Sequence, residues 1–295
     1  MRPAQPCFLE YDPENVDNPD APYAVLPVPY EGTVSYGKGT GSAPEAILKA
    51  SDQLELFDEE LFVPVDIATQ TLAAPDCVNG SQEEIFNRLY TKARSVLEQG
   101  RFLMALGGEH SVSLPLIRAA ADITTPLSVL HLDAHTDLRD SYEGNKLSHA
   151  SVMRRVSEIP VQIVHVGIRS LSHEEYVFLE SVQGIVFWAR DIVCGENQVW
   201  IEQIISALGE NVYISLDVDV LDLSLAPSTG TPEPGGMTWY DCIKLLKCVI
   251  ANRRLVAADI VETVSVPGMR ANEYTAAKLA AKIMMYHKHL GCDRE

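Results

Sequence analysis

The sequence predicts an α/β protein built on a mainly parallel sheet with helices on both faces. Short apolar runs, such as 102–106 and 128–132, are typical of strands buried on both faces. Segments with helical spacing of apolar residues alternate with these runs, and the short connections favour parallel strands. No linker, repeat or low-complexity stretch divides the 295 residues. We therefore expect one domain over 1–295, with residues 1–22 as an irregular lead-in.

The individual elements are predicted from local signals along the chain. Prolines in the run from Tyr23 to Tyr30 predict an edge strand or an early strand end. The glycine-dense loop 31–41 matches neither the Walker A spacing nor the GxGxxG spacing of phosphate-binding loops. Ser42 opens one helix with a proline in its first turn, and a capping box at Ser81–Glu84 opens another, which ends near Gly100. Strands are expected at 24–28, 62–67, 102–106, 128–132, 161–168, 185–188, 211–216 and 255–260, and later helices at 111–121, 149–157, 173–181, 199–208, 238–250 and 272–289.

The composition narrows the class of partner. Lys and Arg number 23 and Asp and Glu 41, which gives a net charge of −18. This balance argues against nucleic acid or an anionic membrane as partner and favours a metal or a cationic substrate, although acidity also serves plain solubility. The six cysteines form no C-x-x-C pair, and no apolar stretch suits a signal peptide or a membrane span. We expect a cytoplasmic protein.

Chemically suggestive residues follow the ends of several predicted strands, where ligands bind in parallel sheets. His110 follows strand 102–106, and the segment Asp133-Ala134-His135-Thr136-Asp137 follows strand 128–132. If the extended backbone continues, alternation directs these two aspartates and His135 to one side. Asp217 and Asp219, at the end of strand 211–216, are spaced in the same way. Each pattern alone also occurs as a polar strand end.

Together these residues predict a site for two metal ions. The set comprises two histidines and four aspartates, whereas one divalent ion needs about four to six ligands. Four carboxylates resist joint ionisation when crowded, and two cations remove that obstacle. The donors suit Mn²⁺, Zn²⁺ or Fe²⁺.

Three motifs resemble the metal-binding signatures of the ureohydrolase (arginase/agmatinase) family, and the resemblance covers nearly the whole chain. They are Gly107-Gly108-Glu109-His110-Ser111, Asp133–Asp137 and Ser215-Leu216-Asp217-Val218-Asp219. The matching stretch starts at Gly32–Tyr36 and ends with Asp259–Glu262. The resemblance implies a single three-layer α/β/α domain of the arginase/deacetylase-like fold, with an eight-stranded parallel sheet and usually a homo-trimer or homo-hexamer.

The resemblance also implies a binuclear manganese site, with two Mn²⁺ per subunit. One ion would be bound by His110, Asp133, Asp137 and Asp217, and the other by His135, Asp133, Asp217 and Asp219. A hydroxide shared by the ions would attack the guanidinium carbon of a small cationic substrate, with Asp137 orienting it. Glu262 matches the family's guanidinium-binding carboxylate and His149 its proton-shuttle histidine. On the residues alone, Glu262 also suits a solvated strand end and His149 a helix cap.

The loops around the site favour agmatine, hydrolysed to putrescine and urea. Glu233, in Gly230–Gly236, is as in agmatinases, and the segment 138–148, which contains Asn145, also resembles them. The net charge suits a dication better than zwitterionic arginine. In one departure, Leu223 follows Asp222 where the family often has proline; this position is not a ligand.

Three alternatives stay open. The substrate could be N1-aminopropylagmatine, guanidinobutyrate, arginine or guanidine. Deacetylase-like amidohydrolases share the fold but bind one catalytic metal. A non-enzymatic metal-binding homologue would be expected to have lost a ligand, and all six are present here. Five histidines match no motif and are interpreted as structural or surface groups: His131, His165, His173, His287 and His289.

Overall fold

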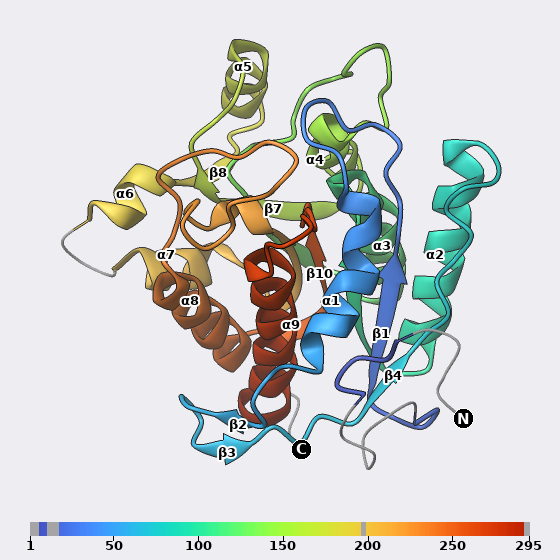
Figure 1. The fold of residues 1–295 in the computed structure, drawn as a ribbon. Helices are drawn as coiled ribbons and strands as arrows, with labels where there is room; N and C mark the ends of the chain where they lie inside the picture. Colours follow the sequence, from blue (N-terminus) through green and yellow to red (C-terminus); the bar gives the residue numbers. More distant parts are fainter. Residues whose placement is uncertain (1–5, 11–17, 196–198, 292–295) are drawn as a thin grey trace.

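The protein folds around one eight-stranded sheet in which every neighbouring pair of strands is parallel (Figure 1). The computed structural model describes residues 6–10, 18–195 and 199–291. The spatial order is β4-β1-β5-β10-β9-β6-β7-β8. The strands are β1 (Tyr23–Val28), β4 (Thr69–Thr71), β5 (Phe102–Gly107), β6 (Leu127–Leu132), β7 (Val161–Ile168), β8 (Ile185–Trp188), β9 (Asn211–Asp217) and β10 (Arg254–Val261).

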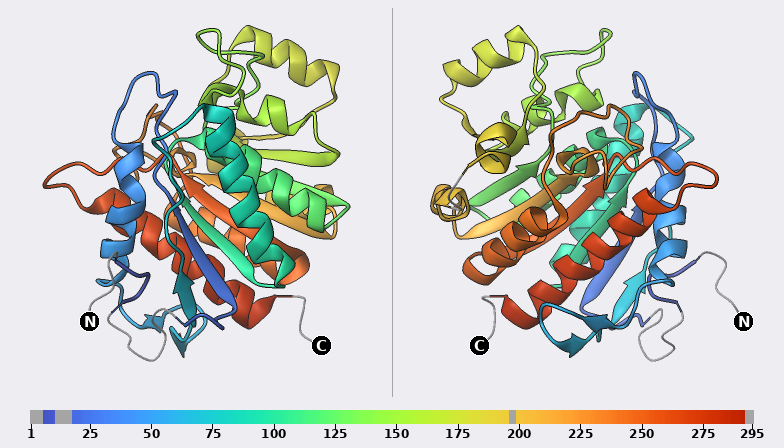
Figure 2. Two further views of the ribbon diagram at one scale, coloured as in Figure 1. Left: turned by 90° about the vertical axis from the view of Figure 1, so that its right-hand side faces the viewer. Right: turned by 60° about the vertical axis from the view of Figure 1, so that its left-hand side comes forward.

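Helices cover both faces of the sheet, which gives the expected three layers (Figure 2). Because side chains alternate along a strand, Met104 and Leu106 of β5 face one core, whereas Leu103 and Ala105 face the other. The first core is closed by α1 (Ala43–Ser51), α6 (Ala189–Val193), α7 (Val199–Ala207), α8 (Trp239–Asn252) and α9 (Ala271–Leu290). The second is closed by α2 (Gln82–Glu98), α3 (Ser113–Ile123), α4 (Val152–Val156) and α5 (His173–Ser181).

One predicted strand is wrong. Residues 62–67 contribute only β3 (Val63–Pro64), which pairs antiparallel with β2 (Phe57–Asp58) in a separate two-stranded sheet. Pro64 cannot donate to a strand ladder, which shortens this run. The eighth strand of the main sheet is β4 instead.

The prediction for the first strand is half right. β1 is second from the edge, not at it, but β4 pairs only with residues 23–25. Pro27 lies beyond β4 and pairs only with β5, so this part of β1 has an edge-like side where no amide donor is needed.

The predicted helices agree with the structure to within a few residues. The capping box at Ser81 is confirmed. Two predicted helices begin as 3₁₀ turns, at His110–Val112 and His149–Ser151, and the short helix α6 was not predicted. The lead-in 1–22 lies partly outside the described residues. Among those that are described, no helix is both long and apolar enough to cross a membrane.

A buried lysine joins α9 to the β2–β3 hairpin. Lys282 is 1% exposed, and its Nζ lies 2.8 Å from Asp58 Oδ2 and 3.1 Å from Glu59 Oε2. Burial opposes the charged forms of both Asp58 and Lys282, but the attraction between the two side chains outweighs burial. This pairing lowers the pKa of Asp58 below 3.8 and raises the pKa of Lys282 above 10.5. The hairpin is therefore held to the main body by buried charge.

We expect Lys282→Met to destabilise the protein by about 3–5 kcal/mol, because it leaves the buried Asp58 carboxylate without its cation. Urea unfolding followed by circular dichroism measures this loss. Lys49→Met, which breaks an ion pair with both side chains 64% exposed, is the control and should cost less than about 1 kcal/mol. Equal effects of the two substitutions would contradict the assigned role.

The same pair fixes the sign of the pH dependence. A carboxyl with a lowered folded-state pKa stabilises the fold above its ordinary pKa, and this stability is lost as the pH falls through the folded-state value. For a lysine with a raised pKa, the stability is present below pH 10.5 and lost above it. The stability gap between wild type and Lys282→Met should therefore narrow below pH 3.8 and above pH 10.5.

Candidate active site

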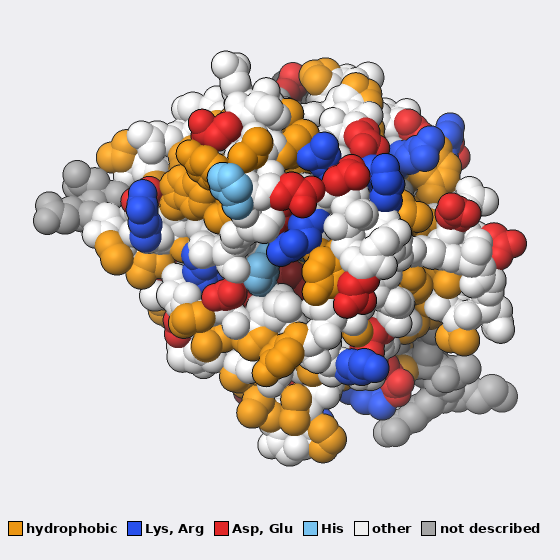
Figure 3. Space-filling view, turned by 90° about the horizontal axis from the view of Figure 1, so that it is seen from above, with side chains coloured by type: hydrophobic (Ala, Val, Ile, Leu, Met, Phe, Trp, Pro, Cys, Tyr) orange, Lys and Arg blue, Asp and Glu red, His pale blue; other side chains and the backbone are white. Residues whose placement is uncertain are grey.

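The candidate site lies at the carboxyl edge of the sheet, where four central strands end. His110 follows β5, the Asp133 segment follows β6, Asp217 ends β9 and Glu262 follows β10. In the sheet order these four strands are adjacent, so their loops meet. Figure 3 shows this end of the molecule, with histidine and acidic side chains near the centre of the face and basic side chains around them.

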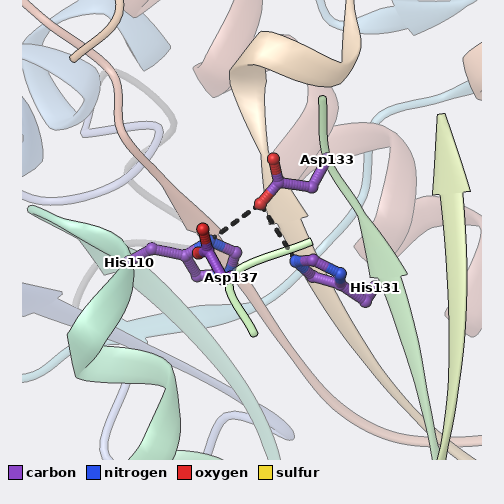
Figure 4. A group of neighbouring side chains, drawn as sticks. All are labelled: His110, His131, Asp133 and Asp137. Carbon is purple, nitrogen blue, oxygen red and sulfur yellow. Dashed lines mark hydrogen bonds and ion pairs between the residues drawn. The ribbon is translucent and has the colours of Figure 1, made fainter. Parts of the chain in front are cut away.

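A first group of side chains surrounds His110. Its Nδ1 lies 3.0 Å from Asp133 Oδ2, 3.1 Å from Asp137 Oδ2 and 3.6 Å from Asp217 Oδ2. His110 is 1% exposed, and within the described residues this nitrogen has no partner with hydrogen-bond geometry. Figure 4 shows the Asp133 carboxylate between His110 and His131, with Asp137 beside His110. Three carboxylate oxygens around one buried imidazole nitrogen form a donor set that suits a divalent ion.

A second group shares Asp133 with the first. His135 Nδ1 lies 2.9 Å from Asp219 Oδ2 and 3.4 Å from Asp133 Oδ1. Asp219 Oδ2 is buried and has no hydrogen-bond partner among the described residues. One carboxylate between two groups is the arrangement that a pair of ions needs. The structure thus brings together all six predicted ligands, and the orphaned buried atoms fit two metal ions.

The backbone route to this convergence differs from the one predicted. β6 ends at Leu132, and Asp137 has a positive φ of 53°, so the extended alternation does not continue through the motif. After β9, Val218–Val220 form a 3₁₀ turn, in which Asp217 accepts a hydrogen bond from the Asp219 amide at 2.8 Å. Turns, and not strand alternation, therefore direct these side chains toward one point.

The acidic cluster has strongly perturbed ionisation. Burial, followed by the neighbouring carboxylates, raises the pKa of Asp217 well above its ordinary value and also raises that of Asp219. Burial would do the same to Asp133, but His131 and the close contacts of His110 and His135 hold its pKa well below the usual range. A pKa of about 12 results for His135, because its aspartate partners outweigh burial. The cluster contains more carboxylates than cations, and divalent metal ions would balance the excess negative charge.

Glu262 lies against the first group. Its Oε1 accepts a hydrogen bond from the His110 amide at 2.7 Å, and it has a positive φ of 61°. Its Oε2 faces Gly230, where a Cβ would come within 2.6 Å of it. Burial and the charge of Glu109 raise the pKa of Glu262 to about 8. Within the described part of the chain, this buried carboxylate forms no ion pair.

His149 is held by the loop after β1. The Thr33 hydroxyl accepts a hydrogen bond from the backbone amide of His149 at 3.0 Å. The same hydroxyl lies 3.3 Å from Nδ1 of the His149 ring. Glu109, which is fully buried, accepts hydrogen bonds from the Gly32 amide and from the amide and hydroxyl of Thr33. The loop is closed at its other end by Glu31, which accepts from Gly39, Thr40 and Gly41. The glycine-dense loop thus surrounds protein carboxylates.

The two predicted specificity residues lie in different settings. Glu233 Oε1 accepts a hydrogen bond from the Ser170 hydroxyl at 2.9 Å, and Arg169 donates to the Glu233 carbonyl at 2.8 Å. The Asn145 amide donates to Gln82 Oε1, and its oxygen accepts from the Leu147 amide. The Asn145 side chain therefore contacts the first residue of α2 at one end and its own loop at the other.

Sequence reasoning missed two groups that support the candidate ligands. His131, predicted to be a structural or surface residue, is buried and lies 2.9 Å from Asp133 Oδ2 through its Nε2. The alternation used for Asp133 also applies to the residue two positions earlier, and would have found it. The second of these supporting groups lies behind His110. His110 Nε2 lies 3.0 Å from the Ser215 hydroxyl, which donates a hydrogen bond to the buried Asp259.

A parallel α/β/α sheet with a buried histidine and aspartate cluster at its carboxyl edge is the architecture of a metal-dependent hydrolase. The model of the Arginase family matches residues 21–287. The chain belongs to the arginase family, and the expected ureohydrolase relationship is confirmed.

Relatives of known activity cover most of the chain. It is 36% identical over 275 residues to the N(1)-aminopropylagmatine ureohydrolase of Synechocystis sp., covering 90% of this chain and 89% of that one. It is 35% identical to the agmatinase of Pyrococcus horikoshii, and the match covers 95% of this chain and 96% of that one. The agmatine ureohydrolase of Thermoplasma volcanium superposes with a TM-score of 0.80 at 28% identity, covering 91% and 90%. Arginase from Bacillus caldovelox, at 21% identity and a TM-score of 0.75, shares the fold.

Substitution of the shared carboxylate tests the candidate metal centre. We expect Asp133→Ala to lose most of the bound Mn²⁺, because both groups use this side chain. Mass spectrometry of metals after equilibration with MnCl₂ and gel filtration measures the loss. Asp140→Ala, at a half-exposed aspartate that pairs with Arg155, is the control and should leave the metal content unchanged. Full occupancy in Asp133→Ala would refute the sharing of this carboxylate.

Proposed function

We propose that the protein hydrolyses the guanidino group of agmatine to urea and putrescine with two manganese ions. The observation that carries the proposal is the pair of His/Asp groups joined by Asp133, with the buried Glu262 carboxylate beside it. Membership of the arginase family supports the reaction class.

The two groups support an assignment of the six predicted ligands to two ions, in which the share of Asp217 in the second ion rests on the resemblance to the family. His110, Asp133, Asp137 and Asp217 would hold one, and His135, Asp133, Asp217 and Asp219 the other. When bound, the ions would lower the pKa of a shared water and supply hydroxide near neutral pH. Mn²⁺ is proposed because mixed carboxylate and imidazole donors suit it.

Three side chains would act on the substrate directly. Glu262 would pair with the planar guanidinium, which replaces the positive charge that its buried carboxylate lacks. Asp137 would orient the attacking hydroxide. His149 would pass a proton to the leaving amine, as an imidazole can act as a general acid, and its hydrogen bond to Thr33 supports this role by holding the residue in place.

Agmatine is the substrate that we propose first, and N1-aminopropylagmatine second. Glu233 stands in the loop that follows β9 and offers a carboxylate to the amine end of either substrate, whereas Asn145 makes the contacts described above. The second substrate is favoured by relatives named N(1)-aminopropylagmatine ureohydrolase, among them a Thermus thermophilus protein at 38% identity. Guanidinobutyrate, arginine and guanidine have no comparable support.

The remaining features of the assignment are also proposals. We propose a cytoplasmic homo-trimer or homo-hexamer, built from one domain per chain over 1–295. No nucleic-acid or membrane partner is proposed, since the net charge of −18 disfavours polyanionic surfaces.

A urea-release assay tests the proposed reaction. With Mn²⁺, the purified protein should release urea from agmatine with the highest kcat/KM among the five guanidino compounds. Protein treated with chelator should release none until Mn²⁺ is restored. A higher kcat/KM with N1-aminopropylagmatine would replace the first substrate by the second, and the absence of urea from all five would refute the proposed function.

Removal of the proposed proton shuttle should slow turnover and leave the metal bound. We expect His149→Ala to lower kcat about 100-fold or more, the size of a general acid's contribution. Metal content should stay at the wild-type value. His173→Ala removes an exposed histidine and should leave both quantities unchanged. Loss of metal together with activity in His149→Ala would assign this residue a structural role.

A further inference from the structure

A pair of buried histidines connects the acidic cluster to β7, outside the set of candidate ligands. His131 of β6 and His165 of β7 occupy paired positions in the sheet. Both are buried, with 0% and 3% of their surface exposed. Apolar residues usually fill such positions in a central strand, because a buried polar side chain costs stability unless it is hydrogen-bonded. The two rings therefore need an explanation.

The two rings form a directed chain of hydrogen bonds. His131 Nε2 lies 2.9 Å from Asp133 Oδ2, and His131 Nδ1 lies 2.8 Å from His165 Nδ1. A neutral imidazole has one donor and one acceptor nitrogen. Because an ionised carboxylate only accepts, His131 Nε2 carries the hydrogen and His131 Nδ1 must accept. His165 Nδ1 is then the donor at the start of the chain.

β7 also holds the backbone of Asp133. The Asp133 amide donates to the Val166 carbonyl at 3.0 Å, one residue after His165. Burial and the neighbouring His131 keep the pKa of His165 well below its usual value, so this ring stays neutral. The strand therefore constrains both the main chain and the side chain of the carboxylate that the two groups share.

We propose that His165, acting through His131, is a positioning residue that orients Asp133 for metal binding. Hydrogen bonds to ligating carboxylates fix their orientation, and their loss typically costs 10–100-fold in metal affinity or activity. This inference rests on the proposed two-metal function and extends it to residues that contact neither substrate nor metal.

His131 could instead be a ligand itself, since it lies within the first group (Figure 4). Its contacts favour positioning. Among the described residues, His131 forms an ion-pair contact with Asp133 alone, whereas His110 faces three carboxylates. The direction of its hydrogen bonds also places a hydrogen, and not a lone pair, on the nitrogen that faces the cluster.

Metal titration of three variants tests the proposal, with Mn²⁺ affinity and stoichiometry measured by electron paramagnetic resonance of the free ion. His165→Phe keeps a ring but removes the donor, and should weaken Mn²⁺ binding about 10-fold. His165→Asn places an amide nitrogen where Nδ1 was and should restore affinity to within about threefold. His131→Gln retains a donor toward Asp133 and should still bind two ions.

Ser128→Ala is the matched control. Ser128 is a buried polar residue at the other end of β6, and its hydroxyl contacts Gln162 of β7 at 3.2 Å. Its loss removes a polar contact between the same two strands without touching the cluster. Mn²⁺ affinity should therefore stay at the wild-type value. The thermal midpoint of each metal-free variant is measured in parallel.

Each outcome decides the question. Unchanged Mn²⁺ affinity in His165→Phe would overturn the proposal. It would also be overturned if His165→Phe and His165→Asn lost Mn²⁺ affinity and metal-free stability to the same extent, because that result would indicate a packing role alone. Binding of only one ion by His131→Gln would make His131 a ligand and also overturn it. If the wild type itself binds no Mn²⁺, the proposed function fails; if it binds two ions and the His165 variants match it, only this inference fails.

Discussion

The mutual repulsion of buried carboxylates is the constraint on which the rest of the structure depends. Asp133, Asp217 and Asp219 meet at the carboxyl edge of the sheet, and burial together with their proximity opposes their ionisation. The chain keeps them together by hydrogen bonds to fixed backbone and imidazole groups, such as the Asp219 amide on Asp217 and His131 on Asp133. A site with more carboxylates than cations favours the binding of divalent metal ions and of positively charged molecules.

The neighbouring loops are fixed by hydrogen bonds to charged side chains. Glu109 ties the loop after β1 to the end of β5, and Glu31 closes that loop on itself. On the other side, Arg169 binds the segment that runs from Asp219 to Pro234. Irregular segments around the site thereby gain defined positions, which a catalytic constellation requires.

Much of this architecture could be predicted from the sequence, because strands buried on both faces and amphipathic helices leave strong periodic signals. The carboxyl-edge rule also places His110, Asp133 and Asp217 near one another from the sequence alone. The short strand β4 could not be recognised, since three residues carry almost no periodicity. The turn at Asp137 was also missed, because a positive φ at a non-glycine residue is imposed by its surroundings. The 3₁₀ turn at Val218–Val220 was missed as well, since three residues carry too little periodicity to predict it. His131 was overlooked although the alternation applied to Asp133 also covers it, whereas the pairing of His165 with His131 of a different strand is visible only in three dimensions.

The attachment of the loop that carries Glu233 has a consequence for how this scaffold can change. Arg169 holds that loop through the carbonyl oxygens of Asp219, Glu233 and Pro234. Every residue type offers the same carbonyl, so the anchor is indifferent to the side chains that the loop displays. Recognition of the far end of a substrate can therefore diverge by substitution at the loop surface while the framework beneath is inherited intact. Under the proposed function, chemistry and selectivity would be physically separable parts of one edge of the sheet.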